Sequence, residues 1–432
     1  MTSSEHPGNS AMSRLTARID SGAGDLDSTG EQTTMYDATI EEVDGRNIRI
    51  GDKWLADFAS CNYLGFDLNQ EIIAASQEAI ERWGTHPSWS RLLGNPALYP
   101  EIEERLTDLL HAADSLVLPT ITLIHTAVLP MLAEGGAILL ERRAHKTLYD
   151  TAVIAKNQGT YLERFRQEDL DAFADQLRKA RAAIGAGQPL LVCLDGLNSM
   201  TGNVPPLAEM TALCERQGAI LYVDDAHGFG VLGENPSPAL PYGYRGNSVV
   251  RHLDQGYDNL ILVGGFSKAY SAILAFIALP TALKEKLKYS APPYLYSGPS
   301  PTASLAGVLA GFEVNDRDGD LIRADLYGKT RRVLDHLDAL GIGTPNVSGS
   351  PIIEIPVAEP EKVPQAAELL WDNGIYVTVA AYPLVPKKEA GFRIQMTAAN
   401  TTDHVERLCG TLSALVDQNI IITQPDRETG HA

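Results

Sequence analysis

Five short apolar runs are spaced along the middle of the chain, and each stops abruptly at small or polar residues. They are SLVLPT (115–120), AILLE (137–141), PLLVCLDG (189–196), AILYVDD (219–225) and NLILVGG (259–265). Continuous aliphatic and β-branched runs of this length are typical of strands that are buried on both faces of a parallel sheet. Segments with helical periodicity separate them. The pattern therefore predicts an α/β fold, a mostly parallel central sheet with helices on both faces.

The regions on either side have a different character. Residues 1–35 are rich in Ser, Gly, Thr and Asp and predict a mobile arm, a kind of segment that sometimes orders against a partner subunit. Residues 36–68 alternate apolar with polar positions around an Asp-Gly pair, which predicts a small β-rich unit with a hairpin. We expect a large α/β domain over 69–305 and a smaller α+β domain over 306–432.

The predicted C-terminal domain begins with two helical patterns, 300–315 and 318–341, separated by a polar stretch that contains glycine. Three alternating segments follow at 350–357, 374–381 and 391–399. Alternation of this kind is typical of strands with one buried face. We expect two long helices and then a small antiparallel sheet.

Composition and charge narrow the class of protein. The chain has 432 residues and a net charge of −20, which excludes nucleic acid and anionic membranes as expected partners. No run of about 18 apolar residues is present, and the N-terminus lacks the apolar core of a signal peptide. Its four cysteines lie far apart and form no metal-binding pair, so we expect reduced thiols, no metal and a cytoplasmic location.

Polar side chains follow two of the apolar runs. Asp224, Asp225 and His227 end one run, and Ser267 and Lys268 follow another. In open α/β sheets, ligands bind at the carboxyl ends of parallel strands. A carboxylate and a lysine placed there can hold the pyridinium nitrogen and the aldehyde of pyridoxal 5′-phosphate (PLP).

Three stretches, in this order, carry a family resemblance: DGLNSMTGNVPPL (195–207), VDDAHGFGVLGE (223–234) and GGFSKA (264–269). They resemble the α-oxoamine synthase family of fold-type-I PLP enzymes. ASCNYLGF (59–66) and SRLLGNPALYPEIEERL (90–106) resemble two further family stretches. The similarity runs from about residue 36 to 418 and is specific to PLP chemistry, but less specific to one reaction.

The resemblance implies roles for five residues. Lys268 matches the lysine that forms a Schiff base with PLP and moves a proton at the substrate Cα. Asp224 matches the carboxylate that keeps the pyridine nitrogen protonated. His227 matches a histidine beside the phenolic oxygen and the acyl substrate, His145 one that stacks on the ring, and Ser199 a hydrogen-bond donor near the phenolic oxygen. A loop histidine at 145 and a plain turn at Ser199 remain open.

Strand alternation sends the carboxylates of Asp224 and Asp225 to opposite faces, so Asp225 is expected to cap the following turn. Two residues are implied to bind the amino acid substrate. Arg393 matches the arginine that holds the α-carboxylate, for which the parallel donors of a guanidinium are suited. Asn62 lies one place after the family asparagine, whose position is Cys61 here. An ordinary turn at Asn62 is an equally open interpretation.

The chain departs from the family pattern around the cofactor phosphate. Thr120, Ile121 and Thr122 replace the Ser, Gly and aromatic residue of the family motif S-G-[YF]-x-A-N. Hydroxyls and helix N-terminal amides can still bind a phosphate there. Gly265 replaces a threonine three places before the lysine, and Ser267 is the residue that would compensate.

Other departures affect the region where the second substrate and the loop of a partner subunit are expected. Tyr99 and Asn400 replace family histidines, and the stretch 84–96 replaces a glycine-rich loop with bulkier residues that include Trp89. The PLP machinery is therefore kept, and the machinery for the second substrate is remodelled.

The resemblance implies a cytoplasmic homodimer that joins an amino acid to an acyl thioester such as an acyl-CoA through a new carbon–carbon bond. One alternative keeps PLP but uses elimination or γ-substitution on an amino acid such as S-adenosylmethionine, followed by addition to an acceptor. A second alternative is a catalytically silent partner subunit, against which Lys268 argues.

Overall fold

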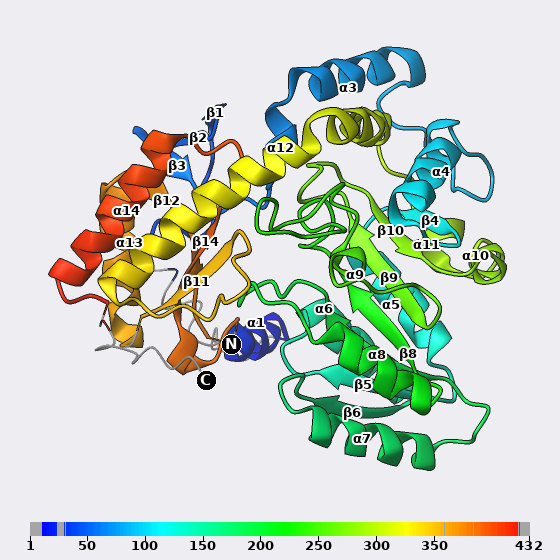
Figure 1. Ribbon diagram of the computed structural model, residues 1–432. Helices are drawn as coiled ribbons and strands as arrows, with labels where there is room; N and C mark the ends of the chain where they lie inside the picture. The colour runs from blue at the N-terminus through cyan, green and yellow to red at the C-terminus, as the bar shows by residue number, and fades with distance from the viewer. Residues whose placement is uncertain are drawn as a thin grey trace, which may run out of the picture.

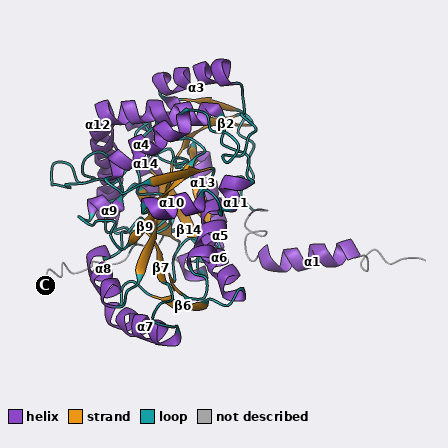
Figure 2. Cartoon of the chain, turned by 90° about the vertical axis from the view of Figure 1, so that its right-hand side faces the viewer, coloured by secondary structure: helices purple, strands orange, loops and turns teal. Residues whose placement is uncertain are grey.

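The computed structural model describes residues 11–23, 30, 32–357, 359–382, 384–421 and 423. Two lobes lie side by side, and the long helix α12 (Thr302–Leu340) runs across both (Figure 1). The predicted N-terminal arm falls partly outside the described residues, at 1–10, 24–29 and 31. Its described part is helix α1 (Ala11–Ala23), which stands clear of the rest of the chain (Figure 2).

The larger lobe contains a seven-stranded sheet that includes all five predicted strands. Its order is β4 (Ser115–Leu118), β10 (Ala275–Ala278), β9 (Leu260–Gly265), β8 (Ile220–Asp224), β7 (Leu190–Asp195), β5 (Ala137–Glu141) and β6 (Tyr161–Phe165). Strands β9 to β6 are parallel, and β10 is antiparallel to both neighbours. The prediction of a mostly parallel sheet is confirmed. The sequence did not predict β6, an edge strand that contains charged residues, or the short β10.

Helices cover both faces of this sheet, with α5 (Ile121–Leu132) and α6 (Lys146–Asn157) on one side and α7 (Leu170–Ala183) and α8 (Leu207–Arg216) on the other (Figure 2). Alternate residues of β7 enter the two cores: Val192 and Leu194 pack on one face, Leu191 and Cys193 on the other. Burying each aliphatic side chain contributes about 1.5–3 kcal/mol. Cys193 is therefore a small core residue.

Helix α12 is continuous where the sequence predicted two helices. Glycine and aspartate in the polar stretch favoured a break, but Gly319 lies where a side chain has no room. A Cβ there would lie 2.5 Å from Oδ1 of Asn315 and 2.9 Å from Nη2 of Arg323. The buried Arg323 guanidinium donates from Nη1 to Asn315 Oδ1 at 2.7 Å and to the Gly230 carbonyl at 3.1 Å. Packing of this arginine against the large lobe explains both the glycine and the unbroken helix.

The smaller lobe combines N-terminal and C-terminal segments. Strands β1 (Glu42–Asp44), β2 (Asn47–Ile50) and β3 (Lys53–Asp57) form the expected β-unit with its hairpin, and β3 pairs in parallel with β12 (Ile375–Tyr376). The expected antiparallel sheet consists of β11 (Ile352–Pro356), β14 (Gly391–Gln395) and β13 (Thr378–Ala380). Segment 374–381 is thus divided between two sheets. The boundaries at 36, 69 and 306 stay a prediction.

The other helices complete the two lobes. They are η2 (Phe66–Leu68), α3 (Gln70–Trp83), α4 (Leu98–Leu110), α9 (Val249–His252), α10 (Thr281–Leu287), α11 (Pro292–Leu295), η3 (Pro360–Lys362), α13 (Val363–Asp372), η4 (Lys387–Glu389) and α14 (Thr402–Asp417). Within the described part of the chain, no helix has the length and apolar character needed to cross a membrane. All four cysteines are free thiols.

Candidate active site

A cavity of about 160 Å³ opens at the carboxyl ends of β7, β8 and β9. It collects every predicted cofactor residue except Gly265, together with four residues that the predicted cofactor set did not include. The predicted residues are Thr120, Ile121, Thr122, His145, Ser199, Asp224, His227, Ser267 and Lys268; the others are Thr147, Asp195, Leu197 and Ala226. The polar residues that follow the buried strands and the residues that the resemblance implied thus lie together.

Parallel strand pairing explains the convergence. Asp224 is the last residue of β8 and lies directly opposite Asp195, the last residue of β7. Lys268 follows the end of β9, the strand on the other side of β8. Because parallel strands end at the same edge of a sheet, two carboxyl groups and an amine meet over a short distance.

Asp224 is held by two hydrogen bonds, one to each carboxylate oxygen. The Ala226 backbone N–H donates to Oδ1 at 3.0 Å, and Nε2 of His125 lies 2.9 Å from Oδ2. The hydroxyl of Tyr222 lies 3.0 Å from Nδ1 of His125. Burial would raise the pKa of Asp224, but the His125 bond and the charges of Lys268 and other neighbours hold that pKa below its ordinary value. Asp224 is therefore an anion at the bottom of the cavity.

The sequence prediction missed His125. It lies on α5 inside the apolar stretch LIHTAV and is completely buried, so its hydrophobic surroundings disguise it as a core position. One indication was available, because His125 occupies the last position of the motif S-G-[YF]-x-A-N, where the family has asparagine. A histidine reaches farther than an asparagine and can touch a carboxylate and a phenol at once.

Asp225 faces the opposite side of the sheet, as strand alternation predicted. Its Oδ2 accepts from the Val249 backbone N–H at 2.9 Å, at the start of α9. A Cβ at Gly228 would lie 2.1 Å from Oδ1 of Asp225, so this turn accepts only glycine beside the buried carboxyl group. The role of Asp225 is to hold the chain after β8.

Asp195 positions His145 and the turn after β7. Its Oδ1 accepts from the His145 backbone N–H at 2.9 Å, and its Oδ2 accepts from Nδ2 of Asn198 at 3.2 Å. Burial and the nearby charge of Asp224 raise the pKa of Asp195 well above its ordinary value. His145 caps α6, and its ring bonds Thr147 at 2.8 Å while facing the cavity. Burial lowers the pKa of His145, which favours a neutral ring.

His227 is buried beside Lys268 and is a neutral imidazole. Burial, with the positive charges of Lys268 and Arg393, lowers its pKa well below the ordinary value. Its Nδ1 lies 2.7 Å from the hydroxyl of Tyr63, and this hydroxyl donates to Oε1 of Gln395 at 2.8 Å. Tyr63 and Gln395 therefore orient the ring so that its other nitrogen is free to exchange a proton.

Neither of the two predicted substrate residues is among those that line the cavity. Arg393, on β14, contacts a lining residue from the smaller lobe: its Nη1 donates to the Ser199 carbonyl at 2.7 Å, and its buried Nε has no hydrogen-bond partner among the described residues. Asn62 makes a different contact. Its Nδ2 donates to Asp67 Oδ2 at 3.0 Å, within the turn around Tyr63. This contact agrees with the second interpretation of Asn62 from the sequence, that of a residue in an ordinary turn.

The N-terminus of α5 opens onto the cavity at the position expected for a phosphate. Thr120 caps the helix, its Oγ1 accepting from the Leu123 N–H at 3.2 Å, so backbone amides of the first turn face the cavity. Ile121 and Gly265, which both differ from the family pattern, lie in contact with each other. A Cβ at Gly265 would lie 2.8 Å from Cδ1 of Ile121. The isoleucine side chain fills the space that a residue larger than glycine would need, so Gly265 contributes room and no hydroxyl.

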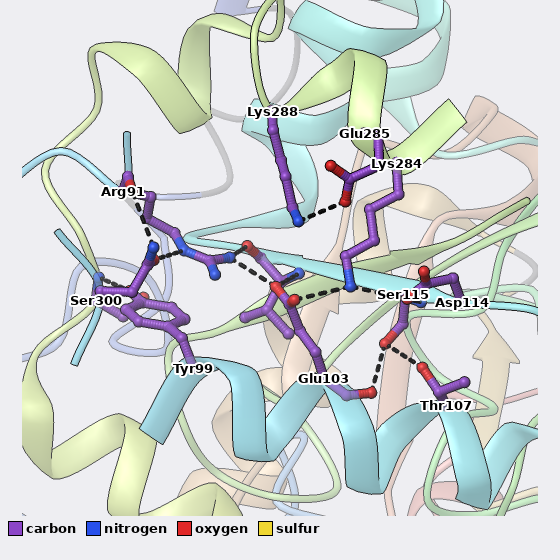
Figure 3. A network of polar contacts seen from close by, with 12 residues as sticks. Arg91, Tyr99, Glu103, Thr107, Asp114, Ser115, Lys284, Glu285, Lys288 and Ser300 are labelled. Atoms are coloured by element: carbon purple, nitrogen blue, oxygen red, sulfur yellow. Dashed lines mark hydrogen bonds and ion pairs between the residues drawn. The ribbon is translucent and has the colours of Figure 1, made fainter. Parts of the chain in front are cut away.

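A buried polar network fixes the loop 84–97 against the large sheet (Figure 3). The Arg91 guanidinium stacks 4.1 Å from the ring centroid of Tyr99 and donates from Nη1 to Oε1 of Glu103 at 2.8 Å. Lys284 reaches the same glutamate from the other side, with Nζ 3.0 Å from Oε2. Tyr99 accepts a bond from the Ser300 N–H at 2.8 Å. The ring and the hydroxyl of Tyr99 therefore both contact members of this network.

The departure at Asn400 also belongs to the framework. Its Oδ1 accepts from the Thr397 backbone N–H at 2.8 Å and its Nδ2 donates to the Asp57 carbonyl at 3.0 Å. Both Tyr99 and Asn400 are buried. Two of the departures from the family pattern, Tyr99 and Asn400, therefore belong to the buried framework of the fold. The departures in the loop 84–96 include exposed side chains: Trp89 and Leu93 are 54% and 80% exposed.

The residues of the cavity suit PLP. The Asp224 carboxylate could pair with the pyridinium nitrogen, and Lys268 could supply the amine for the aldehyde. First-turn amides and hydroxyls at Thr120–Thr122 could hold the phosphate, and the neutral His145 could cover one face of the ring. The chemistry of the donor set therefore matches the cofactor at its nitrogen, aldehyde and phosphate.

Comparisons with known proteins agree with this site. Residues 55–412 match the family model described as aminotransferase class I and II. The putative 8-amino-7-oxononanoate synthase of Desulforudis audaxviator is 31% identical over 84% of this chain and 89% of its own length. The 8-amino-7-oxononanoate synthase of Aromatoleum aromaticum is 32% identical over 87% of this chain and 91% of its own.

Solved structures show the same fold at lower identity. A PLP-bound variant of serine palmitoyltransferase from S. paucimobilis superimposes with a TM-score of 0.83 and 24% identity, over 96% of this chain and 100% of that one. The 8-amino-7-oxononanoate synthase of Francisella tularensis gives a TM-score of 0.69 and 20% identity, over 85% and 99% of the two chains. The chain therefore belongs to the aminotransferase class I and II family and, within it, to the α-oxoamine synthases, fold-type-I enzymes that use PLP.

Proposed function

We propose that this enzyme joins the α-carbon of an amino acid to the acyl carbon of a thioester. The α-carbon loses a proton or CO₂, and the acyl carbon releases the free thiol. The observation that carries the proposal is the convergence of Lys268, Asp224 and His227 on one cavity at the strand ends. The relatives at 31% and 32% identity, both described as 8-amino-7-oxononanoate synthases, support the same reaction class. When bound, PLP supplies the electron sink that stabilises negative charge at the α-carbon.

The side chains of the chain itself perform the remaining tasks. Lys268 holds the cofactor and carries a proton to or from the substrate α-carbon. Asp224 keeps the ring nitrogen protonated through its negative charge. His227, a neutral imidazole oriented by Tyr63, holds or releases a proton near the acyl oxygen. Arg393 binds the α-carboxylate of the amino acid, exchanging the Ser199 carbonyl for a two-pronged carboxylate contact.

A homodimer accounts for apolar side chains exposed around loop 84–97 and the segment before α12. Leu93, Tyr289 and Tyr296 are 80%, 74% and 81% exposed, and Ile273 and Trp89 are more than half exposed. Exposed apolar side chains that form one contiguous patch commonly mark protein interfaces, and we propose that these residues lie where two copies of the chain meet. The four free thiols support placing the enzyme in a reducing compartment such as the cytoplasm.

Two arguments favour condensation over the alternatives raised by the sequence. The change at Ile121 was one reason to consider elimination or γ-substitution, and its match to Gly265 is a packing exchange that leaves the α5 N-terminus facing the cavity. A silent subunit would not need Lys268 in the cavity beside a charged Asp224. Condensation with a thioester is therefore the function that we retain.

Thiol release tests the proposal. Purified PLP-loaded enzyme is incubated with a panel of acyl-CoA thioesters, each with and without single amino acids, and free coenzyme A is titrated with a thiol reagent. The proposal predicts rapid release for at least one pair, dependent on the amino acid. Release that is independent of every amino acid, or no release from any pair, would refute it.

A further inference from the structure

The hydroxyl of Tyr63 has two partners but only one proton to donate. Its oxygen lies 2.8 Å from Oε1 of Gln395 and 2.7 Å from Nδ1 of His227, and all three side chains are buried. A phenol donates one hydrogen bond and can also accept one. Burial raises the pKa of Tyr63 well above its ordinary value, so the proton stays on the oxygen. The partner that receives this proton therefore decides which ring nitrogen of His227 is protonated.

The orientation of the Gln395 amide identifies that partner. Its Nε2 lies 2.8 Å from the backbone carbonyl of Ala59, and a carbonyl oxygen can only accept, so the amino end of the amide must face Ala59. The amide oxygen then faces Tyr63 and can only accept from it. Sγ of Cys61 lies 3.0 Å from the same oxygen and supplies a second donor. Two donors at one end and an acceptor at the other fix the amide in a single orientation.

The hydrogen bonds therefore run in one direction from His227 to Ala59. Tyr63 gives its proton to Gln395, so toward His227 its oxygen can only accept. Nδ1 must then carry the proton of the imidazole. Because burial lowers the pKa of His227 and keeps the ring neutral, Nε2 has no proton and presents a lone pair.

His145, which lines the same cavity, is held in the opposite form. Its Nδ1 accepts from the backbone N–H of Thr147 at 3.4 Å and lies 2.8 Å from the hydroxyl of that residue. A backbone N–H can only donate, so the proton of a neutral His145 is on Nε2. The cavity therefore has one imidazole with a donor at Nε2 and one with an acceptor there.

We infer that Gln395 is a positioning residue that, through Tyr63, makes Nε2 of His227 a base in the resting enzyme. The use of this base rests on the proposed condensation. An amino acid arrives with a charged ammonium group, and its nitrogen can react with the cofactor aldehyde only after it loses a proton. Nε2 takes that proton: the N–H bond breaks, its electron pair stays on the substrate nitrogen, and His227 becomes an imidazolium. The proton that His227 later releases near the acyl oxygen is then one that it took from the amino acid.

Nitrogen-15 NMR of the PLP-loaded enzyme tests the protonation directly and needs no substrate. The histidines are labelled with nitrogen-15, and the His227 signals are identified by their loss in His227→Asn. We expect a protonated Nδ1 and a bare Nε2. In Gln395→Met, Tyr63 loses its acceptor and can donate to Nδ1, so the proton should move to Nε2. Gln176→Met, at a glutamine on α7 that also donates to a backbone carbonyl, is the control and should keep the wild-type pattern.

A His227 with its proton on Nε2 in the wild type would overturn the inference, and so would an unchanged pattern in Gln395→Met. The wild-type spectrum alone decides the point if the variant does not fold. Because no thioester is present, the outcome is separate from that of the thiol-release test. Failure of thiol release with the expected nitrogen-15 pattern would refute the condensation and leave the positioning role of Gln395 standing.

Stopped-flow absorbance tests the role of Nε2 as a base. The PLP-loaded enzyme is mixed with each of the twenty standard amino acids, and the rate of change of the PLP absorbance is measured. At pH 7, Gln395→Met should react about 100-fold more slowly than Gln176→Met, as expected for the loss of a general base. At pH 10 the solvent removes much of the ammonium proton, so the difference should shrink.

The titratable groups that face His227 are the same in both variants, so they do not create this difference. They are Tyr63, Lys268, Arg393 and His145. A defect of equal size at pH 7 and pH 10 would show a purely structural effect and overturn the role as a base. The absence of an absorbance change with every amino acid would overturn it as well.

Discussion

His125 of α5 lies beneath Asp224 at the end of β8, with 2.9 Å between Nε2 and Oδ2. Tyr222, two residues earlier on the same strand, lies 3.0 Å from the other ring nitrogen. Burial raises the pKa of Tyr222 well above its ordinary value, so its hydroxyl keeps its proton. When that hydroxyl donates to Nδ1, the Nε2–H of His125 donates to Asp224. The three side chains hold the carboxylate in its charged form.

Replacing His125 should therefore weaken PLP binding before it weakens the fold. In His125→Ala, Asp224 loses a charge-assisted bond, its pKa rises, and Kd for PLP should increase about 10-fold, as expected for a hydrogen bond to a charged group. Cofactor titration followed by protein fluorescence measures this constant. His336→Ala, at a histidine on α12 away from the cavity, is the control and should leave Kd unchanged. Equal values in the two variants would contradict the role given to His125.

The contact between Ile121 and Gly265 predicts strongly non-additive mutations. Gly265→Thr alone should destabilise the enzyme by about 1 kcal/mol, because the end of the isoleucine side chain must move aside for the added atoms. Adding Ile121→Ala should restore part of that loss. Denaturant unfolding of both single variants and the double variant gives the coupling energy, with about 0.5–3 kcal/mol expected for residues in contact. Additive effects would show that the two positions do not share space.

Because the pKa of Glu354 is raised, the free energy of unfolding should fall as pH rises. Its pKa is near 4.5 in the unfolded chain and about 7 in the folded one, so the folded protein binds the extra proton between these values. Stability is therefore highest below pH 4.5 as far as this group is concerned, and it is lost as pH rises toward 7. The shift corresponds to about 3 kcal/mol.

Glu354→Gln should remove this dependence. Urea unfolding at pH 5 and pH 8 should show the variant gaining stability over the wild type mainly at pH 8. Glu361→Gln, at an exposed position on η3, should show no such gain. An equal effect of Glu354→Gln at both pH values would mean that the carboxyl group is already ionised in the fold at pH 5.

Replacing Arg91 should lower the free energy of unfolding substantially. Arg91→Ala would leave Glu103 facing Lys284 without its second partner and would remove the ring stacking on Tyr99. Breaking a buried pair of this kind typically costs about 3–5 kcal/mol. Arg105→Ala, which breaks exposed ion pairs with Glu313 and Asp316, should cost less than about 1 kcal/mol. Thermal unfolding of the two variants checks the difference, and similar losses would contradict the account of this network.

Sequence patterns were sufficient for the parallel sheet and for most of the cofactor cavity, because strand ends and motif residues report directly on both. Lys268, Asp224 and His145 were predicted on that basis and line the cavity. Side chains that join through tertiary packing were not visible in the sequence. His125 resembles a core residue of an apolar helix, and the role of Gly319 depends on Arg323, which reaches Gly230 in the other lobe. Asn62 is the opposite case. It lies beside a family motif and was predicted to bind substrate, but its side chain bonds within a local turn.

The fate of the α-carbon tests the central claim most directly. The PLP-loaded enzyme is given an amino acid isotopically labelled at its α-carbon together with the acyl thioester that supports thiol release, and the products are analysed by mass spectrometry and NMR. The proposed function predicts an aminoketone in which the labelled carbon is bonded to the acyl carbonyl, formed in equal amount to the released thiol and absent with Lys268→Ala. Thiol release with the label found only in unchanged amino acid, or in a product without the acyl group, would contradict it.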